Sequence, residues 1–180
     1  DGRAMRGDMA FAISQEQTFN SAPTKIRTWT GGVVPLVIEG NLPDPTALLF
    51  AIAHWQQITG LRFVARSNQA DYIRIFHGKP GECWSYVGRV GGAQDLSLGD
   101  GCTGADVAAH ELGHAAGLFH EHDRADRDNY ITIFPQNINP KNLYNFEKVG
   151  FQSAGNYDTS SLMHYESEAF ANPGTRAFQT

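Results

Sequence analysis

The segment HELGHAAGLFHEH, residues 110 to 122, holds four of the seven histidines in the chain. His110 and His114 stand four residues apart. On an α-helix this spacing places two side chains about 40° apart around the axis and one turn along it, so both imidazoles project toward a common point. Imidazole nitrogens are preferred ligands of Zn²⁺. The pair therefore predicts a metal site whose first two ligands come from one helix.

A third ligand cannot come from the next turn of that helix, because the position would lie too far along the axis. Gly117 can take the left-handed conformation that ends a helix, and His120 follows three residues later. The pattern H-E-x-x-H-x-x-G-x-x-H thus predicts three metal ligands, His110, His114 and His120. His122 is an alternative third ligand, but its spacing fits less well, and otherwise we expect it to be exposed to solvent.

Glu111 lies about 100° around the helix from His110, so it need not bind the metal. Its carboxylate can instead face a zinc-bound water, whose pKa the metal lowers toward neutrality, and accept its proton. We interpret Glu111 as a general base that later returns the proton to a leaving amine. Two other interpretations of the histidines stay open, namely ordinary hydrogen-bonded core residues and a structural zinc site. A structural site would close its fourth position with Cys or His and would have no use for Glu111.

Composition limits the class of protein. The chain has 180 residues, 41% of them hydrophobic, which suffices for one globular domain with two lobes. Its net charge is −5 and no basic run occurs, so we expect no nucleic-acid partner. No apolar stretch approaches the roughly 18 residues of a membrane span, so we expect no membrane partner. Cys83 and Cys102 form either one disulfide, which would place the protein outside the reducing cytosol, or two buried thiols.

The elements that must position these residues follow from periodicity and turn signals. Helical spacing predicts a helix over residues 44–60, and a capping-box pattern at Thr103 and Asp106 predicts the start of the histidine helix. Residues 1 to about 24 show no periodicity beyond residues 11–13 and are interpreted as a leader or an arm. Alternating or β-branched segments predict strands over residues 32–40, 61–66, 71–77, 84–90 and 94–98. The second half is mostly irregular, with a short helix over 139–149. This order predicts an α+β fold with a mixed sheet beside a cleft.

The segment HELGHAAGLFHEHDRADRD, residues 110 to 128, resembles the extended zinc signature of the astacin family of zinc metalloendopeptidases, in the metzincin clan. SLMHY, residues 161 to 165, resembles the Met-turn of that family. The likeness extends from about Trp29 to Tyr165. It implies a two-lobed α+β protease with a mixed, mostly parallel sheet, an edge strand over the cleft, a zinc-binding helix and an irregular C-terminal lobe.

The resemblance also implies roles for individual residues. His110, His114 and His120 would bind one zinc ion, and Glu111 would be the general base. Tyr165 would be a further zinc ligand that swings away when substrate binds and then hydrogen-bonds the oxyanion. Met163 would support the site by packing. The family likeness favours a disulfide between Cys83 and Cys102. It also implies that an upper edge strand pairs with an extended substrate, a role that falls on Gln94, Asp95, Leu96, Ser97 and Leu98.

The same resemblance implies a function for the N-terminal arm. Met5-Arg6-Gly7-Asp8 is similar to the pro-segment motif Phe-x-Gly-Asp, with Met where Phe is usual, and its aspartate would occupy the zinc in place of water. This implies a pro-segment over residues 1–21 and a catalytic domain over 22–180. An activating protease would cut near residues 20–22, and the new N-terminal ammonium would pair with Glu121. The alternative for Glu121 is a solvated charge.

The sequence departs from the family at two points. Gly60 stands where animal members often carry a further cysteine, and the chain ends before the family's C-terminal helix, so we expect that part of the domain to be incomplete. With no EGF-like or CUB-like module, the pattern favours a secreted bacterial type. We predict a secreted zinc endopeptidase acting on proteins or peptides, latent through Asp8. The alternative is a catalytically inactive, zinc-containing binding module.

Overall fold

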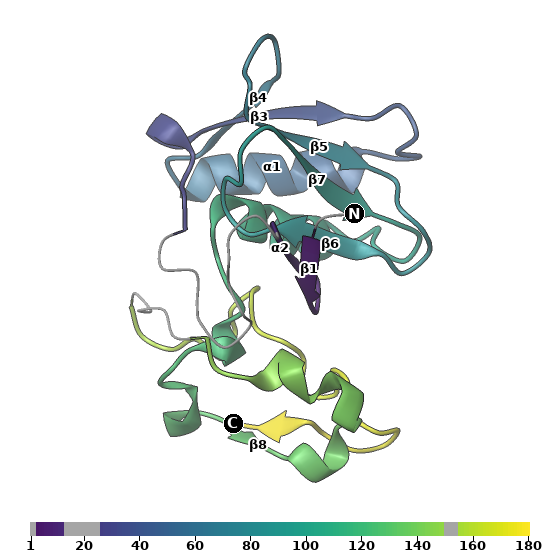
Figure 1. Ribbon diagram of the computed structural model, residues 1–180, viewed down its shortest axis with the longest axis vertical. Helices are drawn as coiled ribbons and strands as arrows, with labels where there is room; N and C mark the ends of the chain where they lie inside the picture. The colour runs from purple at the N-terminus through teal and green to yellow at the C-terminus, as the bar shows by residue number, and fades with distance from the viewer. Residues whose placement is uncertain (1–2, 13–25, 150–154) are drawn as a thin grey trace. The chain divides into compact units, whose positions relative to one another are not determined.

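The computed structural model in Figure 1 describes residues 3–12, 26–149 and 155–180. These residues form two compact units. The described part of the first unit comprises residues 3–12 and 26–118, and that of the second comprises 119–149 and 155–180. The predicted cut near residues 20–22 lies outside the described residues.

A seven-stranded sheet is the frame of the first unit, with the order β1-β2-β6-β7-β5-β3-β4. Four of its neighbouring strand pairs are parallel, and the pairs β1-β2 and β6-β7 are antiparallel. The predicted mixed, mostly parallel sheet is therefore confirmed. The strands are β1 (Arg3–Arg6), β2 (Met9–Ala12), β3 (Val33–Ile38), β4 (Arg62–Ala65), β5 (Tyr72–Phe76), β6 (Cys83–Tyr86) and β7 (Ala93–Leu98), and the short 3₁₀ turn η1 (Thr30–Gly32) precedes β3.

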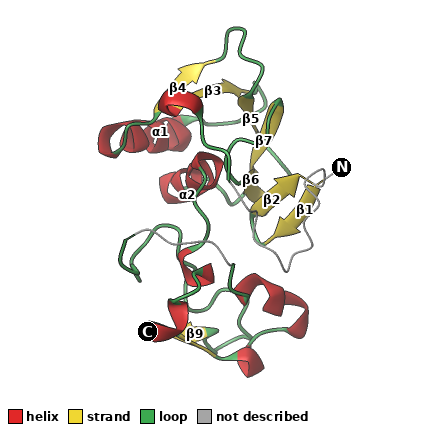
Figure 2. Cartoon of the chain, turned by 60° about the vertical axis from the view of Figure 1, so that its left-hand side comes forward, coloured by secondary structure: helices red, strands yellow, loops and turns green. Residues whose placement is uncertain are grey.

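Two helices, α1 (Thr46–Ile58) and α2 (Ala105–Ala116), pack on one face of this sheet (Figure 2). The alternation along β5 turns Ile73 and Ile75 toward the helices, where both are fully buried. They join one hydrophobic core with Leu48 of α1 and Leu112 of α2. The core fixes α2, and with it the predicted metal ligands, against the sheet.

The sequence predicted the C-terminal end of α2 correctly and its N-terminal end incorrectly. Its last turn closes at Gly117, which has a φ of 116°, as predicted. Its first turn has no capping box, because Gly104 is the N-cap and no side chain caps the helix. The capping-box prediction for Thr103 and Asp106 is therefore wrong. Thr103 lies one residue too early to serve as the N-cap.

The predicted substrate edge strand is corrected by the topology. Residues 94–98 belong to β7, which pairs with β5 on one side and with β6 on the other. A strand with both sides paired cannot accept an additional peptide strand. Alternation of side chains identified β7 as a strand, but it carries no information about the neighbours of that strand. The edge strands of the sheet are β1 and β4.

The N-terminal arm is a β-hairpin and not an irregular leader. β1 and β2 pair antiparallel around a turn in which Gly7 has a φ of 58°. β2 then adds to β6 in parallel, with the Ser85 N–H donating to the Asp8 carbonyl at 3.0 Å and the Val87 N–H to the Ala10 carbonyl at 3.3 Å. The hairpin therefore extends the sheet beyond β6.

One side chain of β1 reaches over the neighbouring strands. The Arg3 guanidinium lies 4.0 Å from the centre of the Trp84 ring of β6, at the distance of a cation–π contact. Trp84 is only 4% exposed and also makes edge contacts with the rings of Phe76 and Tyr86. The hairpin is thus held by side-chain contacts as well as by its backbone.

Cys83 and Cys102 form a disulfide, with their Cα atoms 5.8 Å apart. The implied pairing is confirmed, and the alternative of two buried thiols is excluded. The bond joins the first residue of β6 to the segment just before α2. Within the described residues, no helix combines the length and the hydrophobicity that a membrane crossing requires.

The second unit is built from short elements, as the predicted irregular lobe implies. A core of six buried residues holds it together, namely Ile131, Ile138, Phe146, Tyr157, Ala177 and Phe178. The helix expected over residues 139–149 is instead a 3₁₀ segment of seven residues. The elements are η2 (Glu121–Asp123), η3 (Arg127–Asn129), β8 (Thr132–Ile133), η4 (Pro135–Asn137), η5 (Pro140–Phe146) and β9 (Phe178–Gln179).

Gly117→Ala should destabilise the first unit. Residue 117 has a left-handed backbone, which costs a residue with a Cβ about 1–2 kcal/mol, and an added Cβ would lie 3.2 Å from Ile26 Cγ2. We expect a loss of about 1–2 kcal/mol in the free energy of unfolding, measured by urea denaturation. Gly40→Ala is the control, because nothing lies within 4 Å of a Cβ built there. Equal unfolding midpoints for Gly117→Ala and the parent would contradict the assignment.

Candidate metal centre

Three predicted metal-binding residues meet in the first unit. His110 and His114 project from α2, and Asp8 stands in the turn of the N-terminal hairpin. The Asp8 carboxylate lies 3.3 Å from His110 Nε2 and 3.5 Å from His114 Nε2. The three ligand atoms lie within 4.8 Å of one another. Two imidazole nitrogens and one carboxylate oxygen are a donor set that fits zinc.

His114 is oriented by the turn that ends its own helix. The ring is fully buried, and its Nδ1 lies 2.8 Å from the Leu118 carbonyl. An N–H at Nδ1 that donates to this carbonyl leaves the lone pair of Nε2 directed toward Asp8. The Leu118 N–H in turn donates to the Gly113 carbonyl at 3.0 Å. Gly117 thus ends α2 and also places the backbone acceptor that sets the tautomer of His114.

Glu111 is buried beside these ligands, with 1% of its surface exposed. Burial raises the pKa of its carboxyl well above the usual range, and the negative charge of Asp8 raises it further. Among the described residues, its Oε2 atom has no hydrogen-bond partner. A buried carboxylate oxygen without a partner is costly. The atom is therefore suited to accept a hydrogen bond from a bound molecule such as water.

His120 and His122 lie in the second unit, and both are buried. The prediction that His122 is exposed to solvent is wrong, since none of its surface is accessible. The 3₁₀ turn η2 directs its ring inward, where it stacks on Tyr165 at a centroid distance of 4.0 Å. Burial lowers the pKa of His122 well below its usual value, and the neighbouring His120 lowers it further. This shift favours the neutral ring, whose Nε2 lies 3.1 Å from the Asn145 carbonyl.

The predicted Met-turn is tied to the residue that follows His120. The Glu121 N–H donates to the Met163 carbonyl at 2.8 Å, and Met163 itself is 4% exposed. Tyr165 packs against the core of the second unit, and its ring centre lies 4.4 Å from that of His120. His120, Met163 and Tyr165 therefore form one local arrangement.

Glu121 already has a cation partner. Its Oε1 accepts hydrogen bonds from Arg124 Nη1 at 2.9 Å and from the Asp158 N–H at 3.0 Å. Arg124 is 5% exposed and also binds both oxygens of Asp126. Glu121 is therefore held by an ion pair and a hydrogen bond, and the alternative that it is a solvated charge does not fit.

Sequence reasoning missed three contributors to these arrangements. The Leu118 carbonyl and the Asn145 carbonyl orient histidine rings, and backbone acceptors leave no signal in the residue types. Asp123 is fully buried beside His120 and His122. Its place directly after His120 and His122 in the sequence could have indicated a role beside them. The zinc signature drew attention to other residues of the segment.

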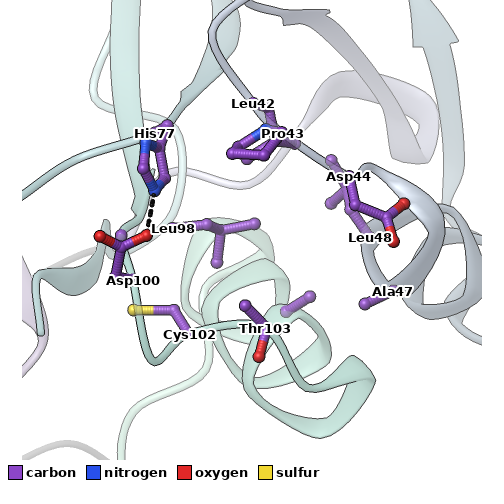
Figure 3. Close-up of a pocket in the computed structure, with 12 residues that line it drawn as sticks. Leu42, Pro43, Asp44, Ala47, Leu48, His77, Leu98, Asp100, Cys102 and Thr103 are labelled. Carbon is purple, nitrogen blue, oxygen red and sulfur yellow. Dashed lines mark hydrogen bonds and ion pairs between the residues drawn. The ribbon is translucent and has the colours of Figure 1, made fainter. Parts of the chain in front are cut away.

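A separate cavity of about 210 Å³ lies between the two helices and the ends of β5 and β7 (Figure 3). His77 Nε2 and Asp100 Oδ1, 2.9 Å apart, stand at one side of it. None of the predicted metal ligands or catalytic residues lines this cavity. It is therefore distinct from the candidate metal centre.

Two proteins of known sequence are similar to this chain. The chain is 43% identical over 179 residues to tolloid-like protein 1 of Homo sapiens and 39% identical over 168 residues to zinc metalloproteinase nas-6 of Caenorhabditis elegans. These matches cover 93% and 90% of this chain, which spans 18% and 48% of the length of the two relatives.

A solved structure is also similar, that of high choriolytic enzyme 1, a hatching-enzyme zinc protease from Oryzias latipes. It superposes with a TM-score of 0.77 at 35% identity, covering 85% of this chain and 79% of the other. Residues 21–179 match the family model described as Astacin (Peptidase family M12A). The chain belongs to the astacin family, peptidase family M12A.

Proposed function

We propose that this chain is a zinc endopeptidase that the N-terminal hairpin holds in a latent form. The observation that carries the proposal is the position of the Asp8 carboxylate, 3.3 and 3.5 Å from the Nε2 atoms of His110 and His114. An acidic side chain at that point would occupy the coordination position on the metal that a reacting group needs. Membership of a family that includes zinc metalloproteinases supports zinc as the metal.

The proposed ligands are His110, His114 and His120. Convergence of the first two in one unit supports their part, and the spacing of the zinc signature supports His120, which follows His114 by six residues. When bound, zinc polarises a carbonyl group and makes water nucleophilic near neutral pH. The protein supplies the remaining chemistry through its own side chains.

Glu111 is the proposed proton carrier. Its buried carboxylate, on the residue next to His110, would take a proton from the attacking water and pass it to the leaving amine. The phenol of Tyr165 would donate a hydrogen bond to the oxyanion that forms on the scissile carbonyl. Its ring contact with His120 supports that role. Met163 would contribute packing only.

Extended segments of proteins or peptides are the proposed substrates, and β6 is the proposed strand on which they bind. In this structure the Asp8 and Ala10 carbonyls of the hairpin accept hydrogen bonds from the N–H groups of Ser85, in β6, and of Val87, just after it. Once the hairpin has left, β6 becomes the edge of the sheet, and the same N–H groups become available to a substrate backbone. The hairpin and the substrate would therefore compete for one strand.

Residues 1–21 are the proposed pro-segment and residues 22–180 the proposed catalytic domain, separated by an activating protease. We propose that the new N-terminal ammonium then pairs with Glu121. Because Arg124 already binds Oε1 of Glu121, the ammonium would rearrange an existing ion pair and would not supply the first cation. The disulfide supports a secreted protein, since such bonds persist outside the reducing cytosol.

Glu111→Gln should abolish most peptide hydrolysis without removing zinc. Glutamine fills the same space but cannot accept the proton, so we expect a loss of about 10²–10⁴-fold in kcat/KM after removal of the hairpin by limited proteolysis. A fluorogenic peptide measures the rate, and elemental analysis measures zinc per chain. The control is Glu168→Gln, whose side chain is 62% exposed. Undiminished hydrolysis would refute the assignment of Glu111, whereas a zinc-loaded but inactive parent would indicate a binding module.

Asp8→Asn should give a chain that is active without cleavage. The amide is uncharged and a far weaker metal ligand than a carboxylate, so the hairpin no longer competes effectively for the metal. We expect the uncut variant to hydrolyse peptide while the uncut parent does not. Asp100→Asn is the matched control, because that carboxylate is exposed and pairs with His77 instead. An uncut variant as latent as the parent would argue against the proposal.

A further inference from the structure

A carboxylate that the proposed mechanism does not use is fully buried next to the third proposed ligand. Asp123 has no accessible surface. Its Oδ2 lies 3.7 Å from His120 Nδ1, beyond hydrogen-bond distance but within that of an ion pair, and its Oδ1 lies 3.3 Å from His122 Nε2. The carboxylate thus directs one oxygen to each of two buried imidazoles.

The position of this carboxylate is fixed by the backbone on both sides. The Asp123 N–H donates to the His120 carbonyl at 3.2 Å, and the Asp123 carbonyl accepts from the Val149 N–H at 2.8 Å. Burying an ionised carboxylate costs several kcal/mol unless charged or polar partners compensate. The two imidazoles are among the partners that stabilise it there.

An orienting carboxylate beside Nδ1 has a consequence for the opposite nitrogen of His120. It favours the proton on Nδ1, which leaves the lone pair on Nε2, and it increases the basicity of that nitrogen toward a metal. In the first unit an acceptor stands closer to the corresponding nitrogen, since the Leu118 carbonyl lies 2.8 Å from Nδ1 of His114 and Asp8 lies 3.5 Å from its Nε2. Both rings would then present Nε2 as the ligand atom.

His122 contributes the second contact. Its Nε2 lies 3.1 Å from the Asn145 carbonyl, within hydrogen-bond distance, and 3.3 Å from Asp123 Oδ1. Its ring is held by stacking on Tyr165 and on His120, with interplanar angles of 30° and 22°. A ring held in this way limits the movement of the carboxylate.

We propose that Asp123 is a positioning residue for the metal, which sets the tautomer and the orientation of His120, and that His122 holds Asp123 in place. This inference rests on the proposed zinc-binding role of His120. It goes beyond that role by assigning to Asp123 part of the affinity for the metal.

The test is the zinc affinity of Asp123→Asn in the full chain, measured by competition with a chromogenic chelator. Loss of an orienting partner of a histidine ligand weakens metal binding by about 10–100-fold, and we expect a loss in that range. Asp128→Asn is the matched control, because this carboxylate lies on the same segment, is 60% exposed and pairs with Arg127 and Lys148. We expect the control to bind zinc as the parent does.

A second measurement separates positioning from support of the fold. In the metal-free parent, nitrogen-15 NMR should show the proton of His120 on Nδ1, and in Asp123→Asn it should show a mixture of tautomers. The thermal midpoint of the metal-free chains reports the structural contribution. A lowered midpoint with zinc affinity within about twofold of the parent would overturn the proposal, because the effect predicted for an orienting ligand partner is larger.

If Asp123→Asn does not fold, His122→Phe tests the proposed role of Asp123 instead. Phenylalanine keeps a ring stacked against Tyr165 but removes the nitrogen beside Asp123, so we expect weaker zinc binding in the same direction and to a smaller extent. Unchanged affinity would overturn the proposal. So would two zinc ions per parent chain, which would make His120, His122 and Asp123 a metal site of their own. A parent that binds no zinc would instead refute the proposed function.

Discussion

The left-handed turn at Gly117 is the constraint on which the candidate centre depends. A helix that continued would carry later side chains away from His110 and His114, so the chain must leave the helix within one turn. A φ of 116° achieves this, and the turn places the Leu118 carbonyl 2.8 Å from His114 Nδ1. One backbone conformation thus ends the helix and places the acceptor that orients His114. Glycine adopts this conformation without the strain that a Cβ would introduce.

Both units contain ionisable groups that would be costly to bury singly. In the first unit Asp8 faces two imidazoles, and in the second Asp123 faces two more. Buried charges persist where partners of the opposite charge or hydrogen-bond donors compensate them. Glu111 is also buried, and its Oε2 has no hydrogen-bond partner among the described residues. Such an atom is suited to the proton transfer that we propose for this residue.

The sequence was most informative where chemistry fixes the spacing. His110, His114 and Gly117 fall where a helix of fixed pitch must place them, and the core strands follow from alternation. The sequence was least informative about which strands lie next to one another in the sheet. The family resemblance implied an edge-strand role for residues 94–98, although β6 and β5 flank β7. Alternation could not correct this, because it shows which side chains face the core and not which strands pair. The hairpin at residues 3–12 was missed because its two strands are only four residues each. His122 is buried by a 3₁₀ turn that carries no periodic signal.

The pairing of the hairpin with β6 fixes the position of Asp8 relative to His110 and His114. The Ser85 N–H binds the carbonyl of Asp8 itself, so the strand pairing with β6 positions the residue that carries the carboxylate. Met9 opposite Ser85 and Ala10 opposite Tyr86 set the register, and both residues of β2 are fully buried. A slip of one residue would turn Met9 away from the core and move Asp8 along β6. The proposed latency would then depend on strand register as much as on the charge of Asp8.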